Sequence, residues 1–247
     1  MLKPFIKRIL PEFGKKWLFK AGIYNSYNPA VGKIEPGDMD RIRPFSTEFG
    51  YDRGGPVDRY YIENFLLKEA IHIKGRCLEI GDNEYSLLYG KDKIIQSDIL
   101  HVNESNKKAT FIGDLSDAPQ IADNLFDCIV LTQTLHLIYD FKAAMGTCHR
   151  ILKPGGILLL TTPGITPIDH GAWKNTWYWS FTEAAILKLA TETFPEGDIQ
   201  TGTFGNVFTA TAFLYGMGLT EVSAEKLNYH DPHFQVTITL KATKKMM

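Results

Sequence analysis

From residue 56 onward, hydrophobic positions follow two alternating patterns along the chain. Apolar residues recur every three or four positions in some segments, which predicts helices, whereas short continuous apolar runs predict buried strands. The helical pattern covers 56–75, 141–152, 181–194 and 206–217, and the strand pattern covers 77–80, 93–99, 109–112, 126–131, 157–161, 199–203 and 234–242. Strands that alternate with helices favour right-handed crossovers and a mostly parallel sheet with helices on both faces. The predicted fold class is α/β, a doubly wound seven-stranded sheet.

The last predicted strand differs from the others. In 234–242 apolar and polar side chains alternate, with Phe234, Val236 and Ile238 on one face and Gln235 and Thr237 on the other. This period of two is typical of a strand with one buried face. It predicts an antiparallel last strand at an edge of the sheet.

The first 52 residues read as a basic, aromatic arm followed by an irregular linker, and 53–247 as the folded domain. Within the first twenty residues, one acidic residue, Glu12, stands against six basic ones: Lys3, Lys7, Arg8, Lys15, Lys16 and Lys20. Interleaved aromatic side chains allow two interpretations, an arm that contacts an anionic membrane surface or a protein partner, or an arm packed on its own domain with solvated lysines.

Composition narrows the class of protein. The net charge is −1, which does not favour a nucleic acid as the main partner. Cys77, Cys128 and Cys148 show no CxxC spacing, so neither a disulfide framework nor a zinc site is expected, and a reducing compartment fits better. No apolar stretch reaches membrane-spanning length, and the N-terminus does not read as a signal peptide. We therefore expect a cytoplasmic protein.

Three predicted strands end in residues suited to an adenosine. In open α/β sheets, ligands bind beyond the carboxyl ends of the strands. Gly81 allows a tight turn with close backbone approach to a ligand. Asp98, placed at the end of the second strand, can accept both ribose hydroxyls, and Asp114, after the third, can accept from an adenine amino group.

At this point the sequence resembles the class I S-adenosylmethionine-dependent methyltransferases. The resemblance runs from about residue 57 to the end, and is carried by Leu78-Glu79-Ile80-Gly81, by 126–132, and above all by 149–158, a helix end that runs through Leu-Lys-Pro-Gly-Gly into an apolar strand. It implies a Rossmann-like methyltransferase domain and S-adenosyl-L-methionine as cofactor. The family's first loop, Gly-x-Gly-x-Gly, here reads Gly81-Asp82-Asn83-Glu84-Tyr85, so two glycines are missing. This Gly-Asp form is similar to a bacterial branch often associated with glycosyltransferases.

The resemblance also implies cofactor contacts. Glu79 is expected near the cofactor's amino group or bracing the loop, and Asp82 or Asn83 is expected at its amino-acid part. The segment with Arg53 and Tyr60 is where the family closes over the methionine end, and a guanidinium there can clamp a carboxylate. Two further residues of this segment, Asp58 and Arg59, share that interpretation. An internal salt bridge that anchors the following helix is the alternative.

Two histidines are the candidates for a catalytic base. His136 follows the fourth strand, where the family's acceptor site begins, and His170 lies in a loop with Trp173 and Trp177. An imidazole suits general-base chemistry near neutral pH, but a structural hydrogen bond at a strand end explains His136 equally well. The tryptophans suit stacking on a sugar or aromatic acceptor, or ordinary packing. The segment 229–233 has two histidines and an acid but no third ligand set, so no metal is predicted.

The resulting hypothesis is a methyltransferase that acts on a small molecule or glycan, at oxygen. A nicotinamide oxidoreductase would need Gly-x-Gly-x-x-Gly after the first strand, and Gly81 is followed by no glycine before Gly90. The other alternative is a non-catalytic relative that keeps the fold and serves as a binding or scaffold protein. The glycine-poor loop is the observation that suggests it.

Overall fold

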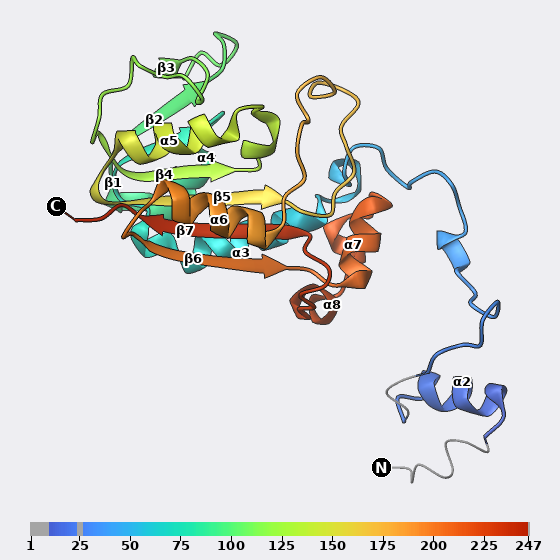
Figure 1. Ribbon diagram of the computed structural model, residues 1–247. Helices are drawn as coiled ribbons and strands as arrows, with labels where there is room; N and C mark the ends of the chain where they lie inside the picture. The colour runs from blue at the N-terminus through green and yellow to red at the C-terminus, as the bar shows by residue number, and fades with distance from the viewer. Residues whose placement is uncertain (1–9, 24–26, 247) are drawn as a thin grey trace. The chain divides into compact units, whose positions relative to one another are not determined.

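The computed structural model describes residues 10–23 and 27–246 of the 247-residue chain (Figure 1). By its internal contacts the chain divides into two units, residues 1–42 and residues 43–247. The basic positions Lys3, Lys7 and Arg8 lie outside the described residues. No helix among the described residues is both long enough and apolar enough to cross a membrane.

The described residues of the first unit include the α-helix α2 (Glu12–Lys20) and a 3-10 turn at Gly37–Met39. Pro11 occupies the position before α2, where an imino acid costs no helical hydrogen bond. Lys16 Nζ lies 2.8 Å from Glu35 Oε2, so one of the basic side chains pairs within the unit. A membrane or protein contact of the arm stays a prediction.

The second unit is built on a seven-stranded sheet in the order β3-β2-β1-β4-β5-β7-β6. The strands are β1 (Gly75–Ile80), β2 (Ile94–His101), β3 (Phe111–Ile112), β4 (Phe126–Thr132), β5 (Leu152–Pro163), β6 (Asp198–Phe204) and β7 (Thr237–Thr243). The first five are mutually parallel, and β7 is antiparallel to both of its neighbours. The predicted mostly parallel sheet with an antiparallel last strand is confirmed. The predicted edge position of that strand is wrong, because β7 lies between β5 and β6, which buries Thr237 and Thr239 as well as the apolar face.

Helices cover both faces of the sheet (Figure 1). One face packs against α5 (Phe141–Ile151) and α6 (Glu183–Thr193), and the other packs against α3 (Val57–Lys68) and α4 (Glu84–Gly90). The remaining helices are α7 (Val207–Leu214) and α8 (Ala224–Asn228). Buried side chains on both faces explain why the central strands read as continuous apolar runs.

Local chemistry sets several element boundaries. Thr182 caps α6, since its hydroxyl accepts from Ala185 N at 3.3 Å. The Leu-Lys-Pro-Gly-Gly segment joins α5 directly to β5, and a Cβ at Gly156 would lie 2.8 Å from the Lys153 carbonyl oxygen. The glycine is therefore required by close backbone packing, as a structural turn.

Residues 43–52, which the sequence suggested as part of the linker, belong to the second unit and pack against its other residues. Phe45 N donates to Tyr215 O at 2.7 Å, and the Phe49 ring lies against Phe213 with centroids 6.2 Å apart. This segment thereby reaches the side of the sheet where the carboxyl ends of the parallel strands lie.

Candidate active site

The turn after β1 has the open geometry that a ligand site requires. Gly81 has φ +91°, a region that favours glycine, and its N–H donates to Leu100 O at 2.9 Å. Apart from its two chain neighbours, no described residue has an atom within 4 Å of the position that a Cβ would take at Gly81. The predicted tight turn is present, and the space above it is not filled by the protein.

Glu79 braces this turn from below. Its carboxylate accepts from the backbone N–H groups of Tyr85 at 3.2 Å and Ser86 at 2.7 Å, at the start of α4. Burial raises the pKa of Glu79 to about 7, against the opposing effect of these hydrogen bonds. Of the two expected roles, the structure shows the bracing one.

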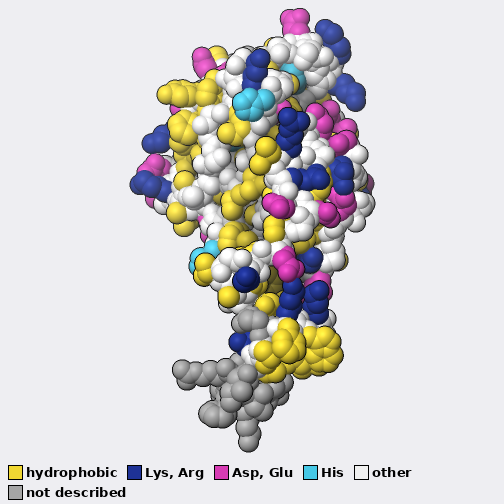
Figure 2. Space-filling view, turned by 90° about the vertical axis from the view of Figure 1, so that its right-hand side faces the viewer, with side chains coloured by type: hydrophobic (Ala, Val, Ile, Leu, Met, Phe, Trp, Pro, Cys, Tyr) yellow, Lys and Arg dark blue, Asp and Glu magenta, His cyan; other side chains and the backbone are white. Residues whose placement is uncertain are grey.

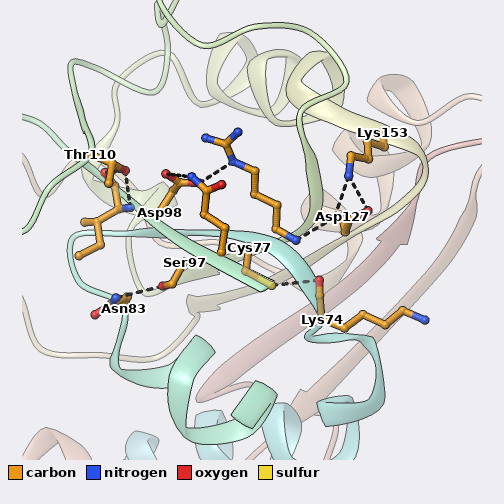
Figure 3. Close-up of polar contacts among 11 residues, drawn as sticks. Lys74, Cys77, Asn83, Ser97, Asp98, Thr110, Asp127 and Lys153 are labelled. Carbon is orange, nitrogen blue, oxygen red and sulfur yellow. Dashed lines mark hydrogen bonds and ion pairs between the residues drawn. The ribbon is translucent and has the colours of Figure 1, made fainter. Parts of the chain in front are cut away.

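The residues that replace the two glycines have partners within the protein. Asn83 Nδ2 donates to Ser97 Oγ at 3.0 Å (Figure 3). Ser97 pairs in register with Cys77, whose side chain belongs to the core beneath α3, so the Asn83 side chain turns toward the face covered by α3 and α4. Asp82 Oδ1 accepts from Asn83 N at 2.5 Å. The loop is thus held by its own side chains, and the contacts of Asp82 and Asn83 with a cofactor stay a prediction.

The position predicted for Asp98 is wrong. The strand β2 continues past it to His101, and Asp98 is only 1% exposed inside the sheet. Arg76 Nε lies 2.7 Å from Asp98 Oδ2, and Gln96 Nε2 lies 3.2 Å from Oδ1 (Figure 3). Both carboxylate oxygens therefore have protein partners, which suits a structural ion pair better than a ribose contact.

The true ends of β2 and β3 bring other residues to Gly81. His101 is the last residue of β2, and Gly113 N donates to its carbonyl oxygen at 3.0 Å. Asn106 Nδ2 donates to Gly81 O at 2.8 Å. Asp114 follows β3 as predicted and accepts from Ser116 N and Oγ at 2.8 Å, so its adenine contact stays a prediction. The apolar Ile99-Leu100 pair after Asp98 was the signal that the strand runs on.

Two residues expected over the methionine end face elsewhere. Arg53 forms an ion pair with Glu221 and lies over the Phe45 ring, 5.5 Å from its centroid. Tyr60 donates from its hydroxyl to Asn228 Oδ1 at 2.9 Å. The salt-bridge alternative is the one that the structure supports for Arg53, and neither side chain lines the cavity described next.

The neighbouring Arg59 is the guanidinium that faces the site. One of its terminal nitrogens contacts the Tyr85 hydroxyl, and the other lies 3.3 Å from the Tyr51 hydroxyl. Its carbon Cζ lies over both rings, at 5.4 Å from the Tyr85 centroid and 5.8 Å from that of Tyr51. Among the described residues no carboxylate forms a salt bridge with Arg59. This partly buried cation is therefore available to an anionic group.

A cavity of about 160 Å³ lies between Tyr85 of α4 and the ends of β4 and β5. One wall comes from the segment before β1 and from α3 and α4, and the opposite wall from the residues after β4, the loop after β5 and α7. Its lining residues are Phe49, Tyr51, Pro56, Asp58, Arg59, Ile62, Tyr85, Thr132, Gln133, His136, Leu137, Pro163, Thr166, Trp173, Trp177 and Phe213. Burial raises the pKa of Asp58 to about 6, so the cavity holds a desolvated acid beside the guanidinium.

Of the two candidate bases, the structure brings His136 and not His170 to the cavity. His136 is 2% exposed, its ring centroid lies 4.5 Å from that of Trp177, and Nδ1 has no hydrogen-bond partner among the described residues. Burial lowers the pKa of His136 to about 4, so the ring is neutral at neutral pH. His170 is exposed and does not line the cavity.

We expect His136 to make the protein less stable in acid. A folded-state pKa of about 4 against an ordinary value of 6.5 means that stability is present above pH 6.5 and is lost as the pH falls toward 4. Between about pH 7.5 and about pH 5 the loss from this residue should be roughly 2 kcal/mol. Urea unfolding gives the free energy of unfolding of the wild type and of His136→Phe at both pH values. The loss of this free energy between the two pH values should be larger in the wild type. Asp58 and Glu79, whose raised pKa values act in the opposite direction, are common to both proteins. An equal loss of unfolding free energy in the two proteins would contradict the low pKa assigned to His136.

The polar side chains of the loop before β7 do not converge on a common site. His230 Nε2 lies 2.9 Å from Thr203 Oγ1, and His233 Nδ1 lies 2.8 Å from Asp231 Oδ1. None of the three titratable side chains lines the cavity.

On the face drawn in Figure 2, basic and acidic side chains lie among each other, with hydrophobic side chains between them. This mixture agrees with the near-zero net charge of −1.

Comparison with known proteins adds an independent line of observation. Residues 92–160 match a family model described as a methyltransferase domain. The ubiquinone/menaquinone biosynthesis C-methyltransferase UbiE of Klebsiella pneumoniae subsp. pneumoniae is 31% identical over 98 residues, which are 38% of this chain and 37% of that protein. The chain thus aligns with little more than a third of the length of this curated relative.

Two solved structures resemble most of the second unit. A putative sarcosine dimethylglycine methyltransferase from Galdieria sulphuraria superposes with a TM-score of 0.53 at 16% identity, covering 77% of this chain and 89% of that one. The [4+2]-cyclase SpnF superposes with a TM-score of 0.52 at 18% identity, covering 76% and 81%. At these identities the likeness concerns the fold. Together with the strand order, it establishes that this chain has the Rossmann-like fold of the class I methyltransferases.

Proposed function

We propose that this chain is an S-adenosylmethionine-dependent methyltransferase that acts on a small molecule. The observation that supports this best is the open, left-handed turn at Gly81, braced by Glu79 and followed by Tyr85, which lines an aromatic cavity. A nucleoside at the turn would leave its amino-acid part beside that cavity. The methyltransferase domain match over 92–160 agrees with this function.

The residues present fit the cofactor in three respects. The backbone at Gly81 leaves room for a ligand, because a Cβ there would meet no protein atom within 4 Å. Asp114 stands at the end of β3, where an adenine amino group would need an acceptor. Arg59, held between two phenol rings without a carboxylate partner among the described residues, suits the methionine carboxylate. When bound, S-adenosylmethionine supplies an activated methyl group for in-line displacement, so the protein's task is positioning.

His136 is the residue that we assign to the acceptor. Its neutral ring at the cavity wall can exchange a hydrogen bond at Nδ1 with a hydroxyl and fix the direction of its oxygen. A pKa of about 4 makes it a weak proton acceptor, so orientation is its larger contribution. We retain oxygen as the methylated atom and a small molecule or glycan as the acceptor, in the manner of the bacterial branch that the loop resembles. The relative UbiE is named for methylation at carbon, and mass spectrometry of the product separates the two.

Calorimetry with S-adenosylhomocysteine tests the cofactor part of the proposal. Folded protein should give a saturable heat with a stoichiometry of about one per chain, since the strand ends form a single crevice. The absence of heat at about millimolar ligand would correspond to an affinity weaker than about −4 kcal/mol and would overturn the proposal. Quenching or enhancement of nicotinamide fluorescence on mixing would favour the oxidoreductase instead.

A second function is kept because the fold alone does not fix the chemistry. The cyclase SpnF shares this fold, and the glycine-poor loop is compatible with a protein that binds without transferring methyl groups. Binding of S-adenosylhomocysteine combined with no transfer of labelled methyl to any small molecule of a cell extract would favour that alternative.

A further inference from the structure

Three side chains on one stretch of the cavity wall carry buried polar nitrogens that lack a hydrogen-bond partner among the described residues. They are Gln133 Nε2, His136 Nδ1 and Trp177 Nε1, and all three residues line the cavity. An unpaired buried polar atom is a stability cost, and native proteins leave few of them. Three in one place indicate groups that are reserved for a ligand.

The backbone around these groups is built to present them. Gln133 has φ +44°, a left-handed conformation that is unfavourable for a residue with a side chain. It is held there by a hydrogen bond from its N–H to Thr161 O at 2.9 Å. The loop that bears Trp177 is fixed to the same place, because Tyr178 N and Trp179 N donate to His136 O at 3.1 and 3.2 Å. Strain at a ligand-facing position is typical of functional sites.

The kind of atom that lacks a partner selects the ligand. The Gln133 amide nitrogen and the Trp177 indole nitrogen can only donate, and a neutral histidine carries one N–H. A sugar would bring as many hydroxyl donors as acceptors. Its own hydroxyl groups would therefore compete with the protein's N–H donors for the same oxygen acceptors. Oxygens that chiefly accept, as in carbonyl, carboxylate or phenolate groups, satisfy the set better.

The surroundings of the three nitrogens favour a flat apolar body. The Phe49 and Trp177 rings stack with centroids 5.9 Å apart and an angle of 6° between their planes. Leu137, Pro163 and Phe213 complete an apolar surface around them. An apolar, aromatic lining of this kind suits a planar conjugated ring better than a polyol.

We infer that Gln133, His136 and Trp177 form the acceptor-binding wall of this cavity, and that the wall takes a planar aromatic or quinone-like ring bearing oxygen acceptors. This inference rests on the proposed function and narrows its acceptor from any small molecule or glycan to this chemical class. The three residues act in recognition: each supplies a hydrogen bond to the ring's oxygens.

The probes are 2-hydroxy-1,4-naphthoquinone and 4-hydroxybenzoate, with methyl glucoside as the polyol. Each is titrated against the full chain saturated with S-adenosylhomocysteine, and binding is followed by calorimetry and tryptophan fluorescence. At least one ring probe should bind, with methyl glucoside at least about tenfold weaker, since a polyol leaves donors unpaired. Binding of methyl glucoside alone, or of no probe, would overturn the inference.

Trp177→Phe gives the sharper test, because it keeps an aromatic side chain and removes the unpaired N–H together with one ring of the indole. It should weaken the ring probe about tenfold and leave the melting temperature of the ligand-free protein unchanged or raised by a few degrees, roughly 2–4 °C. Gln133→Leu should behave in the same way.

The matched control is Trp179→Phe. Trp179 Nε1 donates to Ile138 O at 3.2 Å and to Tyr139 O at 3.3 Å, and the residue does not line the cavity. This variant should lose stability and keep probe affinity. If Trp177→Phe instead loses stability like Trp179→Phe and keeps probe affinity, the unpaired nitrogen has no ligand role. Failure of the probes with S-adenosylhomocysteine bound contradicts this inference alone, whereas failure of S-adenosylhomocysteine to bind contradicts the proposed function.

Discussion

Replacement of Gly81 by valine should strongly weaken cofactor binding while the protein still folds. The backbone there has φ +91°, which a β-branched residue adopts only under strain, and the new side chain would project into the space that the protein leaves open. We expect the affinity for S-adenosylhomocysteine to fall by roughly 100-fold, equivalent to about 3 kcal/mol, as measured by calorimetry. Gly81→Ala, which shares the backbone strain but adds one methyl group, should lose about tenfold.

Gly32→Val is the control for strain alone. Gly32 has φ +78° and also has no atom within 4 Å of a Cβ, but it lies in the first unit. Its variant should bind S-adenosylhomocysteine as the wild type does. Circular dichroism of Gly81→Val establishes that the second unit remains folded. Unchanged binding by a folded Gly81→Val protein would place the nucleoside site elsewhere.

Much of the fold could be predicted because its signals are local. Buried parallel strands are continuous apolar runs, as in 126–131, and the helix cap at Thr182 is set by its own side chain. The edge position given to the last strand failed for a non-local reason. Alternation in 234–242 reports that one face is apolar, but the neighbours of a strand depend on where β6 pairs, and β6 covers the outer side of β7.

The site was predictable in outline and not in its contacts. The turn at Gly81 follows from the residue type, and its position was predicted correctly. Arg53 and Arg59 are six positions apart with the same charge, and nothing in the sequence says that Glu221, far along the chain, takes the first of them. Gln133 was not singled out at all, since its left-handed backbone and unpaired amide exist only in the folded chain.

Asp98 shows how a residue that matches a motif can be predicted to bind a ligand although it forms an ion pair within the sheet. An acid near the end of a second strand is the expected ribose ligand of this fold, and Asp98 has the right type at about the right spacing. Three more strand residues follow it, however, and a cation from β1 lies beside it. The register pairs Leu78 with Asp98, so the carboxylate lies within the sheet and not at its tip.

The structural assignment of Asp98 predicts a large loss of stability when its cation is removed. Arg76→Met would leave a carboxylate with 2% side-chain exposure without its ion pair, and such a change costs about 3 kcal/mol or more. Replacing both partners, Arg76→Met with Asp98→Leu, should recover most of this loss, because a well-packed apolar pair can substitute for a buried ion pair. Urea unfolding measures both variants. Lys153→Met is the control: its ion pair with Asp127 is far more exposed, at 41% and 34%, so it should cost less than about 1 kcal/mol.

The same double variant decides between stability and ribose binding. If Asp98 only holds the sheet together, Arg76→Met with Asp98→Leu should bind S-adenosylhomocysteine within about threefold of the wild type, a change of less than 1 kcal/mol. A ribose ligand would instead lose one or two charge-assisted hydrogen bonds and roughly 10- to 100-fold in affinity. If the double variant is stable but loses this affinity for S-adenosylhomocysteine, Asp98 is a cofactor ligand after all. In that case β2 must open beyond Asp98 when the nucleoside binds.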